Sequence, residues 1–321
     1  MKRVLMYLKS DDRVKSDILK MFSENGFECK MIADQNELKD ADLSDVEVVL
    51  GNVDVCYIEK MPSIKWLSLT TSGADKYTGR IRDDIILTNA RGAFGHAISE
   101  YMVGAVFNIF KGFHLYRDNQ REEVWKKERT AKSVSGSTVL IIGMGDIGSS
   151  FAAAMKKLGC YIIGVRRTDK KKPECFDEVY IGDGFDKAFQ KADIVALCVP
   201  ENDDTIGILN RRRIEMLKEG CCVVNVGRGS AIDSEALCDA LQNERIFGAV
   251  LDVFETEPLP AGDRLWKMKN AVLTPHISQK LPGIHEPEGY ISRLLIENCS
   301  RYLKGEELVN RINPTNGYPL D

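Results

Sequence analysis

The chain of 321 residues is long for one hydrophobic core and therefore predicts two domains. Its 44% hydrophobic and 29% charged residues are typical of a globular protein, and a net charge of −4 argues against nucleic acid or a membrane as its partner. Nine cysteines, with no zinc-type pair of CxxC motifs and no secretory leader, predict a protein of the reducing cytoplasm without a metal site.

The first hundred residues alternate between strand-like and helix-like segments, which predicts a small α/β domain. A helix is expected at residues 16–26, and strands are expected at residues 3–9, 28–32, 46–51, 64–70 and 84–90. From Ala97 to about Arg117, small and apolar residues recur at helical spacing and predict one long helix. The polar residues 121–137 that follow are expected to form a linker or arm.

A second and more complete α/β series begins at Thr138. Its strands are expected at residues 138–143, 161–165, 177–181, 193–199, 221–226, 247–253 and 271–275. After His276 the strand pattern stops, and a helix near residues 287–304 leads into a polar tail. Two such series favour an α/β fold with two parallel sheets flanked by helices.

A glycine motif lies between the first strand of the second series and the helix that follows. Gly143, Gly145 and Gly148 form GxGxxG. In such a turn the first glycine permits the tight bend, the second lets a pyrophosphate approach the backbone, and the third lets helix and strand pack closely. The phosphates then lie on free N–H groups at the helix N-terminus. The strand-to-helix setting indicates a dinucleotide site, and the alternative is a plain glycine turn.

The strand IIGVRRT, residues 162–168, ends in Arg166 and Arg167. It lies about 20 residues past the glycines, where an NAD-binding fold keeps an acidic residue for the ribose hydroxyls. A guanidinium cannot accept a hydrogen bond from a hydroxyl, but it binds a phosphate through two parallel donors. The sequence therefore favours NADP, bound as NADPH, with NAD as a weaker alternative. The other interpretation is that both arginines are solvated charges at the strand end.

Three further strand ends carry reactive side chains: Arg228 in VNVGRG, the acids Asp252, Glu255 and Glu257 in DVFETEP, and His276 in TPHIS. In a doubly wound sheet ligands bind outside the carboxyl ends of the strands, so these segments can converge. Such a set suits reduction of a 2-keto acid, because arginine holds the carboxylate and polarises the keto oxygen, histidine donates the proton, and glutamate orients the imidazole. Spacing alone does not separate Glu255 from Glu257.

GMGDIG, VNVGRG, DVFETEP and TPHIS, in this order and at these separations, resemble the D-isomer-specific 2-hydroxyacid dehydrogenase family across nearly the whole chain. TTSGADKY resembles the family's substrate loop, ILTNARGAFGHAISEY its domain crossover, and VNRINPTNGY its tail. The resemblance implies two doubly wound parallel-sheet domains. A Rossmann nucleotide-binding domain, residues 98–279, would be inserted in a flavodoxin-like substrate domain, residues 1–97 and 280–321. It also implies a homodimer built around the helix and arm near residues 98–135.

The resemblance implies a role for each candidate residue as well. Arg228, Glu257 and His276 would be catalytic, and backbone donors at Ser72 and Gly73 would bind the substrate carboxylate beside Arg228. Asp252 would contact the nicotinamide carboxamide. The residues expected to bind the cofactor are Gly143, Gly145, Asp146, Ile147, Gly148, Arg166, Arg167, Thr168, Pro200, Thr205, Val226, Asp252 and Ser278.

Two segments depart from the family pattern and leave the substrate open. After TPHIS the chain continues QKLPGIHEPE in place of small residues and threonine, so Lys280 and His285 either favour an acidic substrate or lie on the surface. ENDDT replaces a more apolar stretch. The predicted activity is NADPH-dependent reduction of glyoxylate, hydroxypyruvate or a bulkier 2-keto acid. The alternatives are a nucleotide-sensing protein, as in the family's corepressor branch, and oxidation of formate or phosphite. The formate enzymes carry Gln where Glu257 stands, which argues against that branch.

Overall fold

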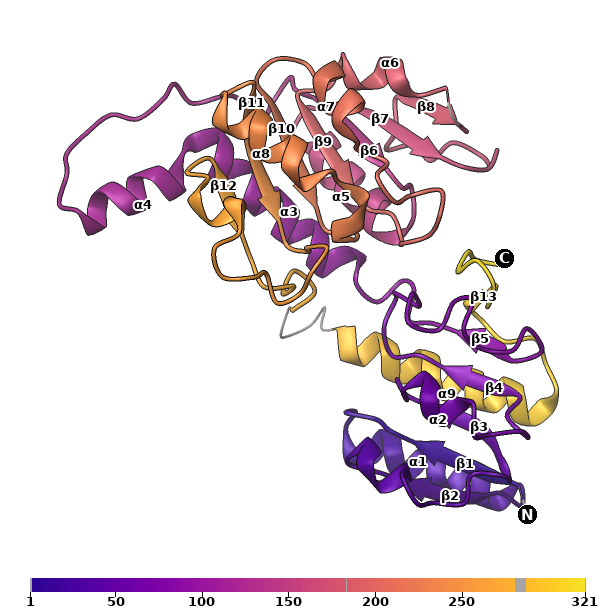
Figure 1. Cartoon of the computed structure of the whole chain (residues 1–321). Coiled ribbons are helices and arrows are strands. Elements are labelled where there is room, and N and C mark those ends of the chain that lie inside the picture. Colours follow the sequence, from indigo (N-terminus) through magenta and orange to yellow (C-terminus); the bar gives the residue numbers. More distant parts are fainter. Residues whose placement is uncertain (1, 183, 281–286, 321) are drawn as a thin grey trace. The chain divides into compact units, whose positions relative to one another are not determined.

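The structure, a computed structural model, describes residues 2–182, 184–280 and 287–320. The chain divides into two compact units. The terminal unit comprises Met1–Ala93 and Gly283–Asp321, and the central unit, Phe94–Pro282, is inserted between these two segments. Each unit contains a largely parallel sheet with helices packed on it (Figure 1), which confirms the expected α/β fold with one domain inserted in the other.

The sheet of the terminal unit has the order β13-β5-β4-β3-β1-β2, which contains the flavodoxin-like arrangement 2-1-3-4-5. Its strands are β1 (Arg3–Met6), β2 (Glu28–Met31), β3 (Val46–Leu50), β4 (Trp66–Ser68), β5 (Ile86–Thr88) and β13 (Arg311–Ile312). The first five pair in parallel. The sixth strand, β13, was not predicted, because the strand pattern of the sequence stops after His276. The tail returns to pair antiparallel with β5, and two residues are too few to produce a strand pattern.

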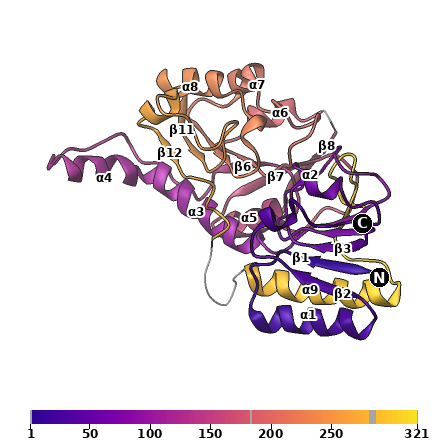
Figure 2. The same ribbon diagram turned by 60° about the horizontal axis from the view of Figure 1, so that its bottom comes forward.

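The helices of the terminal unit are α1 (Asp12–Glu24), α2 (Val55–Ile58), the 3-10 helix η1 (Gln35–Leu38) and α9 (Pro287–Lys304). Helix α1 begins four residues earlier than expected, because the Asp11 side chain accepts a hydrogen bond from the Arg13 N–H and caps the helix. Helices α1 and α9 lie side by side against the sheet (Figure 2). They share one core with the strands, formed by Val4, Met6, Ile18, Phe22, Val48, Leu50, Trp66, Leu295, Cys299 and Leu308.

The sheet of the central unit has the order β12-β11-β10-β9-β6-β7-β8. Its strands are β6 (Thr138–Ile142), β7 (Tyr161–Arg166), β8 (Glu178–Ile181), β9 (Ile194–Leu197), β10 (Cys221–Asn225), β11 (Ile246–Leu251) and β12 (Ala271–Leu273). All of these pairs are parallel. Counted from β6, the order is the Rossmann order 3-2-1-4-5-6 with one added strand.

Helices cover both faces of this sheet, because nearly every strand residue is apolar and side chains alternate between the faces. The helices are α3 (Gly95–Lys111), α4 (Phe113–Arg121), α5 (Asp146–Lys157), α6 (Asp186–Phe189), α7 (Arg211–Met216) and α8 (Ser234–Gln242), with 3-10 helices η2 (Gly229–Ala231) and η3 (Arg264–Lys267). In β6, Leu140 and Ile142 join a core with α6, α7 and α8, whereas Ile141 faces Gly148 of α5. Helices α3 and α5 pack against each other.

The long helix expected from Ala97 to about Arg117 is two helices. Helix α3 ends at Lys111 and α4 begins at Phe113, because Gly112 between them is left-handed with φ of 68°. Helix α4 extends away from the sheet in both views (Figures 1 and 2), and residues 122–137, all of which the structure describes, contain no helix or strand. The exposed large apolar side chains of this region are Phe113, Tyr116, Val124 and Trp125.

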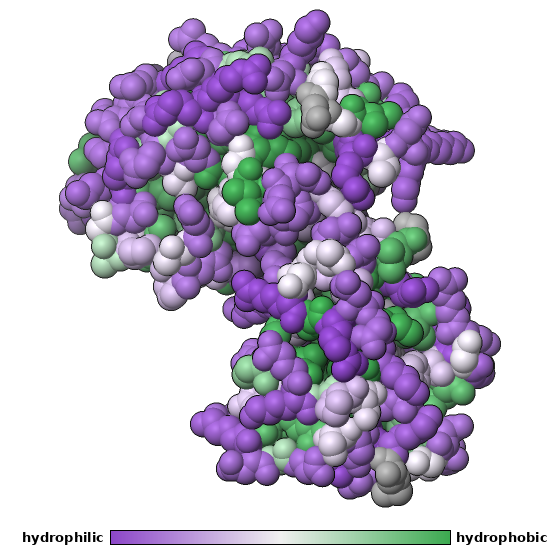
Figure 3. Space-filling model, turned by 45° about the vertical axis from the view of Figure 1, so that its right-hand side comes forward, coloured by the Kyte–Doolittle hydropathy of each residue, from purple (hydrophilic) through white to green (hydrophobic). Residues whose placement is uncertain are grey.

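Hydrophilic residues cover most of the surface of each unit on the face shown in Figure 3. Among the residues that the structure describes, none of the helices has both the length and the apolar character needed to cross a membrane.

Candidate active site

The carboxyl ends of the parallel strands in the central unit meet at one edge of its sheet. The segments that follow β6, β7, β9, β10, β11 and β12 carry, in turn, Gly143, Arg167, Pro200, Arg228, Asp252 and His276. Residues from distant parts of the sequence therefore lie at the same edge, where a doubly wound sheet binds its ligands.

The glycine turn after β6 has the geometry that a dinucleotide requires. Gly143 has φ of 101°, and a Cβ there would lie 2.5 Å from a backbone carbonyl after β9. A Cβ on Gly148 would lie 2.0 Å from the Gly143 carbonyl oxygen. Apart from the residues next to it in the chain, no described residue comes within 4 Å of a Cβ placed on Gly145, so this side of the turn is open to a pyrophosphate. The Asp146 carboxylate points to the first turn of α3, where it accepts the Gly95 N–H at 2.8 Å.

Arg166 is the last residue of β7, and its guanidinium bends back over the segment that follows. It donates to the backbone carbonyls of Lys170 and, at 3.2 Å, of Lys171, and its side chain is only 14% exposed. Arg167 and Thr168 are exposed. Residues 166–172 contain five basic residues and one acidic residue, so this strand end carries a concentrated positive charge. The hydrogen bonds of Arg166 hold the backbone of this segment.

Arg228 lies in a tight turn between β10 and η2. Asn225 holds this turn, because its Nδ2 donates to the Arg228 carbonyl at 2.9 Å and its Oδ1 accepts the Gly227 N–H at 3.1 Å. The Arg228 Nη1 donates to the Gly227 carbonyl at 2.7 Å. A Cβ on Gly229 would lie 1.9 Å from the Phe254 carbonyl carbon, so glycine lets the Arg228 turn contact the segment after β11.

His276 and Glu257 form a direct pair. The histidine Nδ1 lies 2.9 Å from Glu257 Oε2, and Glu257 Oε1 accepts the Phe254 N–H at 3.0 Å. The side chains of His276 and Glu257 are 44% and 37% exposed. The contact is made by Glu257, while Glu255 is exposed and has no bond to the histidine. Because Nδ1 is engaged, Nε2 is the nitrogen through which the ring can exchange a proton with a substrate.

Asp252 is fully buried and organises the segment that carries His276. Its carboxylate accepts the Thr274 hydroxyl at 2.6 Å and the N–H groups of Ile277 and Ser278 at 2.9 Å. Its backbone carbonyl accepts the His276 N–H at 2.9 Å. These bonds bind Asp252 to the TPHIS turn; its contact with a nicotinamide carboxamide stays a prediction.

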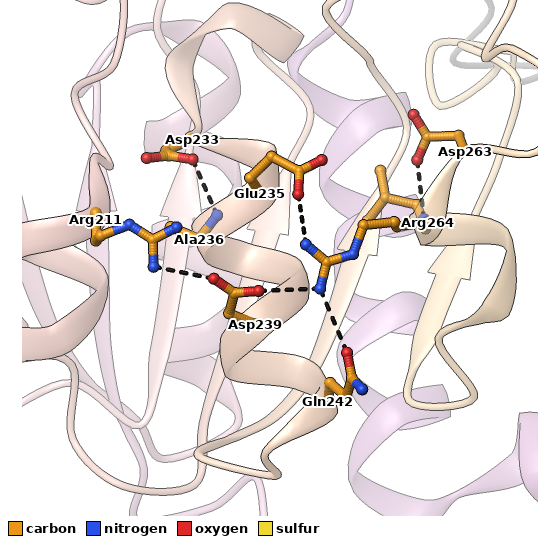
Figure 4. Close-up of polar contacts among 9 residues, drawn as sticks. Arg211, Asp233, Glu235, Ala236, Asp239, Gln242, Asp263 and Arg264 are labelled. Carbon is orange, nitrogen blue, oxygen red and sulfur yellow. Dashed lines mark hydrogen bonds and ion pairs between the residues drawn. The ribbon is translucent and has the colours of Figure 1, made fainter.

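An ion-pair network fixes the far end of the segment that carries Glu257 (Figure 4). Arg264 of η3 pairs with Glu235 and, at 2.9 Å, with Asp239, both on α8, and Arg211 pairs with the same Asp239 at 3.0 Å. The bonds to Glu235 and Asp239 raise the pKa of Arg264. Each exposed pair contributes little alone, but the network ties the segment between β11 and β12 to α8 at several points.

The remaining candidates in the central unit lie in the strand-end segments. The Thr205 hydroxyl donates to the Pro200 carbonyl at 2.6 Å and closes the turn after β9. Val226 is buried, and Ile147 lies half-buried in the first turn of α5. Ser278 is buried next to Asp252, as described above.

In the terminal unit, Ser72 and Gly73 lie in the loop after β4. Asn89 Nδ2 donates to the Ser72 carbonyl at 2.6 Å, and the Thr71 hydroxyl donates to the Gly73 carbonyl at 2.9 Å. Asn52 Nδ2 in turn donates to Thr71 Oγ1 at 2.8 Å. Sequence analysis did not identify Asn52 or Asn89 as supports of this loop. Each of these asparagines comes at the end of an apolar strand in the sequence, and that pattern could have identified both.

Sequence analysis also missed Asn225 and Thr274, although both lie inside motifs that it used for their charged members. Of the residues suggested for an acidic substrate, Lys280 is exposed, and His285 lies outside the described residues. The described part of the chain contains no group of three or more His, Cys, Asp or Glu side chains that could hold a metal ion.

A Rossmann-ordered sheet with an open glycine turn, and with a histidine–glutamate pair at its carboxyl edge, is typical of a nicotinamide-dependent dehydrogenase. The chain belongs to the D-isomer specific 2-hydroxyacid dehydrogenase family, because the model of that family's NAD binding domain matches residues 103–278. The expected family is thereby confirmed, and the protein is an oxidoreductase with a nicotinamide cofactor.

Curated relatives and solved structures agree with this family. A glyoxylate reductase of Pyrococcus horikoshii is 31% identical over 237 residues, covering 70% of this chain and 67% of the relative. A glyoxylate reductase of Thermococcus litoralis is 28% identical over 281 residues, covering 84% of this chain and 82% of the relative. The crystal structure of a D-isomer specific 2-hydroxyacid dehydrogenase family protein from Aeromonas salmonicida matches with a TM-score of 0.82 at 28% identity, covering 98% of this chain and 99% of that chain.

Proposed function

We propose that this protein reduces a 2-keto acid to the D-2-hydroxy acid with NADPH. The observation that carries the proposal is the 2.9 Å contact between His276 and Glu257, next to the turn that holds Arg228. Family membership supports it, and glyoxylate is the first substrate to test because the two relatives above are glyoxylate reductases.

Each residue has one task in the proposed reaction. Arg228 binds the substrate carboxylate and polarises the keto oxygen with its planar set of donors. His276 gives its Nε2 proton to that oxygen, and Glu257 holds Nδ1 so that the ring stays oriented. The bound reduced nicotinamide supplies the hydride. The role of the Ser72 and Gly73 backbone in binding a carboxylate, which the resemblance to the family implies, stays a prediction.

The proposal is tested with purified protein, NADPH and a panel of 2-keto acids that includes glyoxylate, hydroxypyruvate and bulkier acids. Absorbance at the nicotinamide band should fall with at least one of them. Binding of NADPH without turnover of any acid would contradict the proposal and would favour a nucleotide-sensing protein.

The proposed preference for NADPH rests on the basic strand end at residues 166–172. A charged hydrogen bond to the 2′-phosphate contributes ~1.5–3 kcal/mol, so NADPH should bind roughly tenfold to a hundredfold more tightly than NADH. Arg166→Asp should weaken NADPH far more than NADH, because it removes a cation and also releases the loop that Arg166 holds. Titration of both cofactors measures this.

Lys157→Asp is the matched control for the cofactor, because it makes the same change of charge in the last turn of α5, at the opposite end from the glycine turn. It should leave both affinities unchanged. Equal affinity of the wild type for NADPH and NADH would refute the preference.

We also propose that the chain forms a homodimer through α4 and the segment after it. Four large apolar side chains are exposed there, with Val124 at 47% and Trp125 fully exposed. Exposed apolar patches of this kind mark protein interfaces. Light scattering should give the mass of two chains for the wild type and of one chain for Val124→Asp/Trp125→Asp. A wild-type mass of one chain would rule the dimer out.

A further inference from the structure

Helix α3 is connected to the His276 segment by two hydroxyl groups. The Tyr101 hydroxyl of α3 lies 2.6 Å from Thr274 Oγ1, and Thr274 Oγ1 lies 2.6 Å from Asp252 Oδ1. Asp252 also accepts the N–H groups of Ile277 and Ser278. The residues on the two sides of His276 are therefore attached to one buried carboxylate, and that carboxylate is attached to α3 through Thr274.

The direction of the hydrogen bonds follows from the number of protons. An ionised carboxylate only accepts, so Thr274 must use its single hydroxyl proton for Asp252. Tyr101 must then be the donor to Thr274. Burial, together with the negative charge of Asp252, raises the pKa of Tyr101 to about 12, so the phenol keeps the proton that it donates.

The backbone at His276 needs such support. His276 has φ of 51°, a left-handed conformation that is uncommon for residues other than glycine and is kept only when the surrounding contacts determine it. The contacts on either side of His276 are those of Thr274, Ile277 and Ser278 with Asp252. The same turn sets the direction in which the imidazole meets Glu257.

We propose that Tyr101 is a positioning residue for the proton donor: through Thr274 and Asp252 it holds the TPHIS turn in the conformation that keeps His276 paired with Glu257. Tyr101 touches neither Glu257 nor His276 in the hydrogen bonds of the described residues and acts only through Thr274. The inference rests on the proposed role of His276, and its test includes a measurement that needs no catalysis.

The test compares Tyr101→Phe and Thr274→Val, which each remove one hydroxyl, with Thr274→Ser, which keeps it. The first two should lower kcat for keto-acid reduction about three- to tenfold, as expected for one buried hydrogen bond, while KM for NADPH and for the keto acid changes less than about twofold. Thr274→Ser should retain wild-type kcat. The double variant Tyr101→Phe/Thr274→Val should be no slower than Thr274→Val, because Tyr101 acts only through the Thr274 hydroxyl.

Hydrogen exchange of the backbone amides provides the measurement without catalysis. The Ile277 and Ser278 amides should exchange at least about fivefold faster in Tyr101→Phe and Thr274→Val, and at the wild-type rate in Thr274→Ser. Tyr302→Phe is the matched control, because it removes a tyrosine hydroxyl bonded to Glu47 in the terminal unit. It should change neither kcat nor these exchange rates.

Unchanged exchange at Ile277 and Ser278 in Tyr101→Phe would overturn the proposal, and so would losses in kcat that multiply in the double variant. A wild-type protein that reduces no keto acid would defeat the proposed function, while the exchange rates would still decide whether Tyr101 holds the turn.

Discussion

Replacing His276 with alanine is expected to lower kcat for keto-acid reduction by roughly 10²- to 10⁴-fold, the usual contribution of a positioned general acid. NADPH should still bind with nearly wild-type affinity, because the glycine turn and the basic strand end are untouched. The keto oxygen would lose its proton donor, whereas the substrate carboxylate would keep Arg228. Steady-state kinetics with a titration of NADPH measures both effects.

The glutamates on the preceding segment provide the matched comparison for His276. Glu257→Gln should slow reduction, because a neutral amide holds the imidazole Nδ1 less firmly than the carboxylate that contacts it at 2.9 Å. Glu255→Gln should behave as the wild type, since Glu255 makes no bond to the histidine. Oxidation of the hydroxy acid requires the unprotonated ring, so its pH dependence should be opposite to that of reduction. A larger defect in Glu255→Gln than in Glu257→Gln would reverse the assignment.

Arg228→Lys is expected to lower kcat/KM for the keto acid by about tenfold to a hundredfold, although the positive charge remains. Lysine lacks the planar pair of donors that contacts a carboxylate and a keto oxygen together, and a charged hydrogen bond contributes ~1.5–3 kcal/mol. The affinity for NADPH should change little. The measurement is initial-rate kinetics across substrate concentrations at saturating NADPH.

Arg212→Lys is the control for this substitution, because Arg212 is an exposed residue that pairs with Asp186 on the surface. It should keep the wild-type kcat/KM. If Arg228→Lys also kept it, Arg228 would not contact the substrate in the proposed way.

Most of the fold could be predicted from the sequence, because apolar strands and glycine turns are local patterns. Each expected strand is present with ends that differ by a few residues, and GxGxxG follows β6 and opens α5 as predicted. The prediction of one long helix was wrong at Gly112. Small and apolar residues continue there in helical spacing, but the backbone of Gly112 is left-handed and ends the helix. The strand at Arg311–Ile312 was missed because it exists only by pairing with β5.

The candidate site likewise combines features that local sequence patterns predict with features that depend on tertiary contacts. The sequence by itself determined the family, the dinucleotide turn and the strand ends that carry Arg228 and His276, since each depends on residues that are close in the chain. Residue spacing could not separate Glu257 from Glu255, and the resemblance to the family pointed to Glu257. The physical reason appears only in the tertiary structure, because it depends on which carboxylate reaches a histidine on another strand end. Only packing of α3 on the sheet brought Tyr101 to Thr274, a contact between residues 173 positions apart for which no local pattern exists.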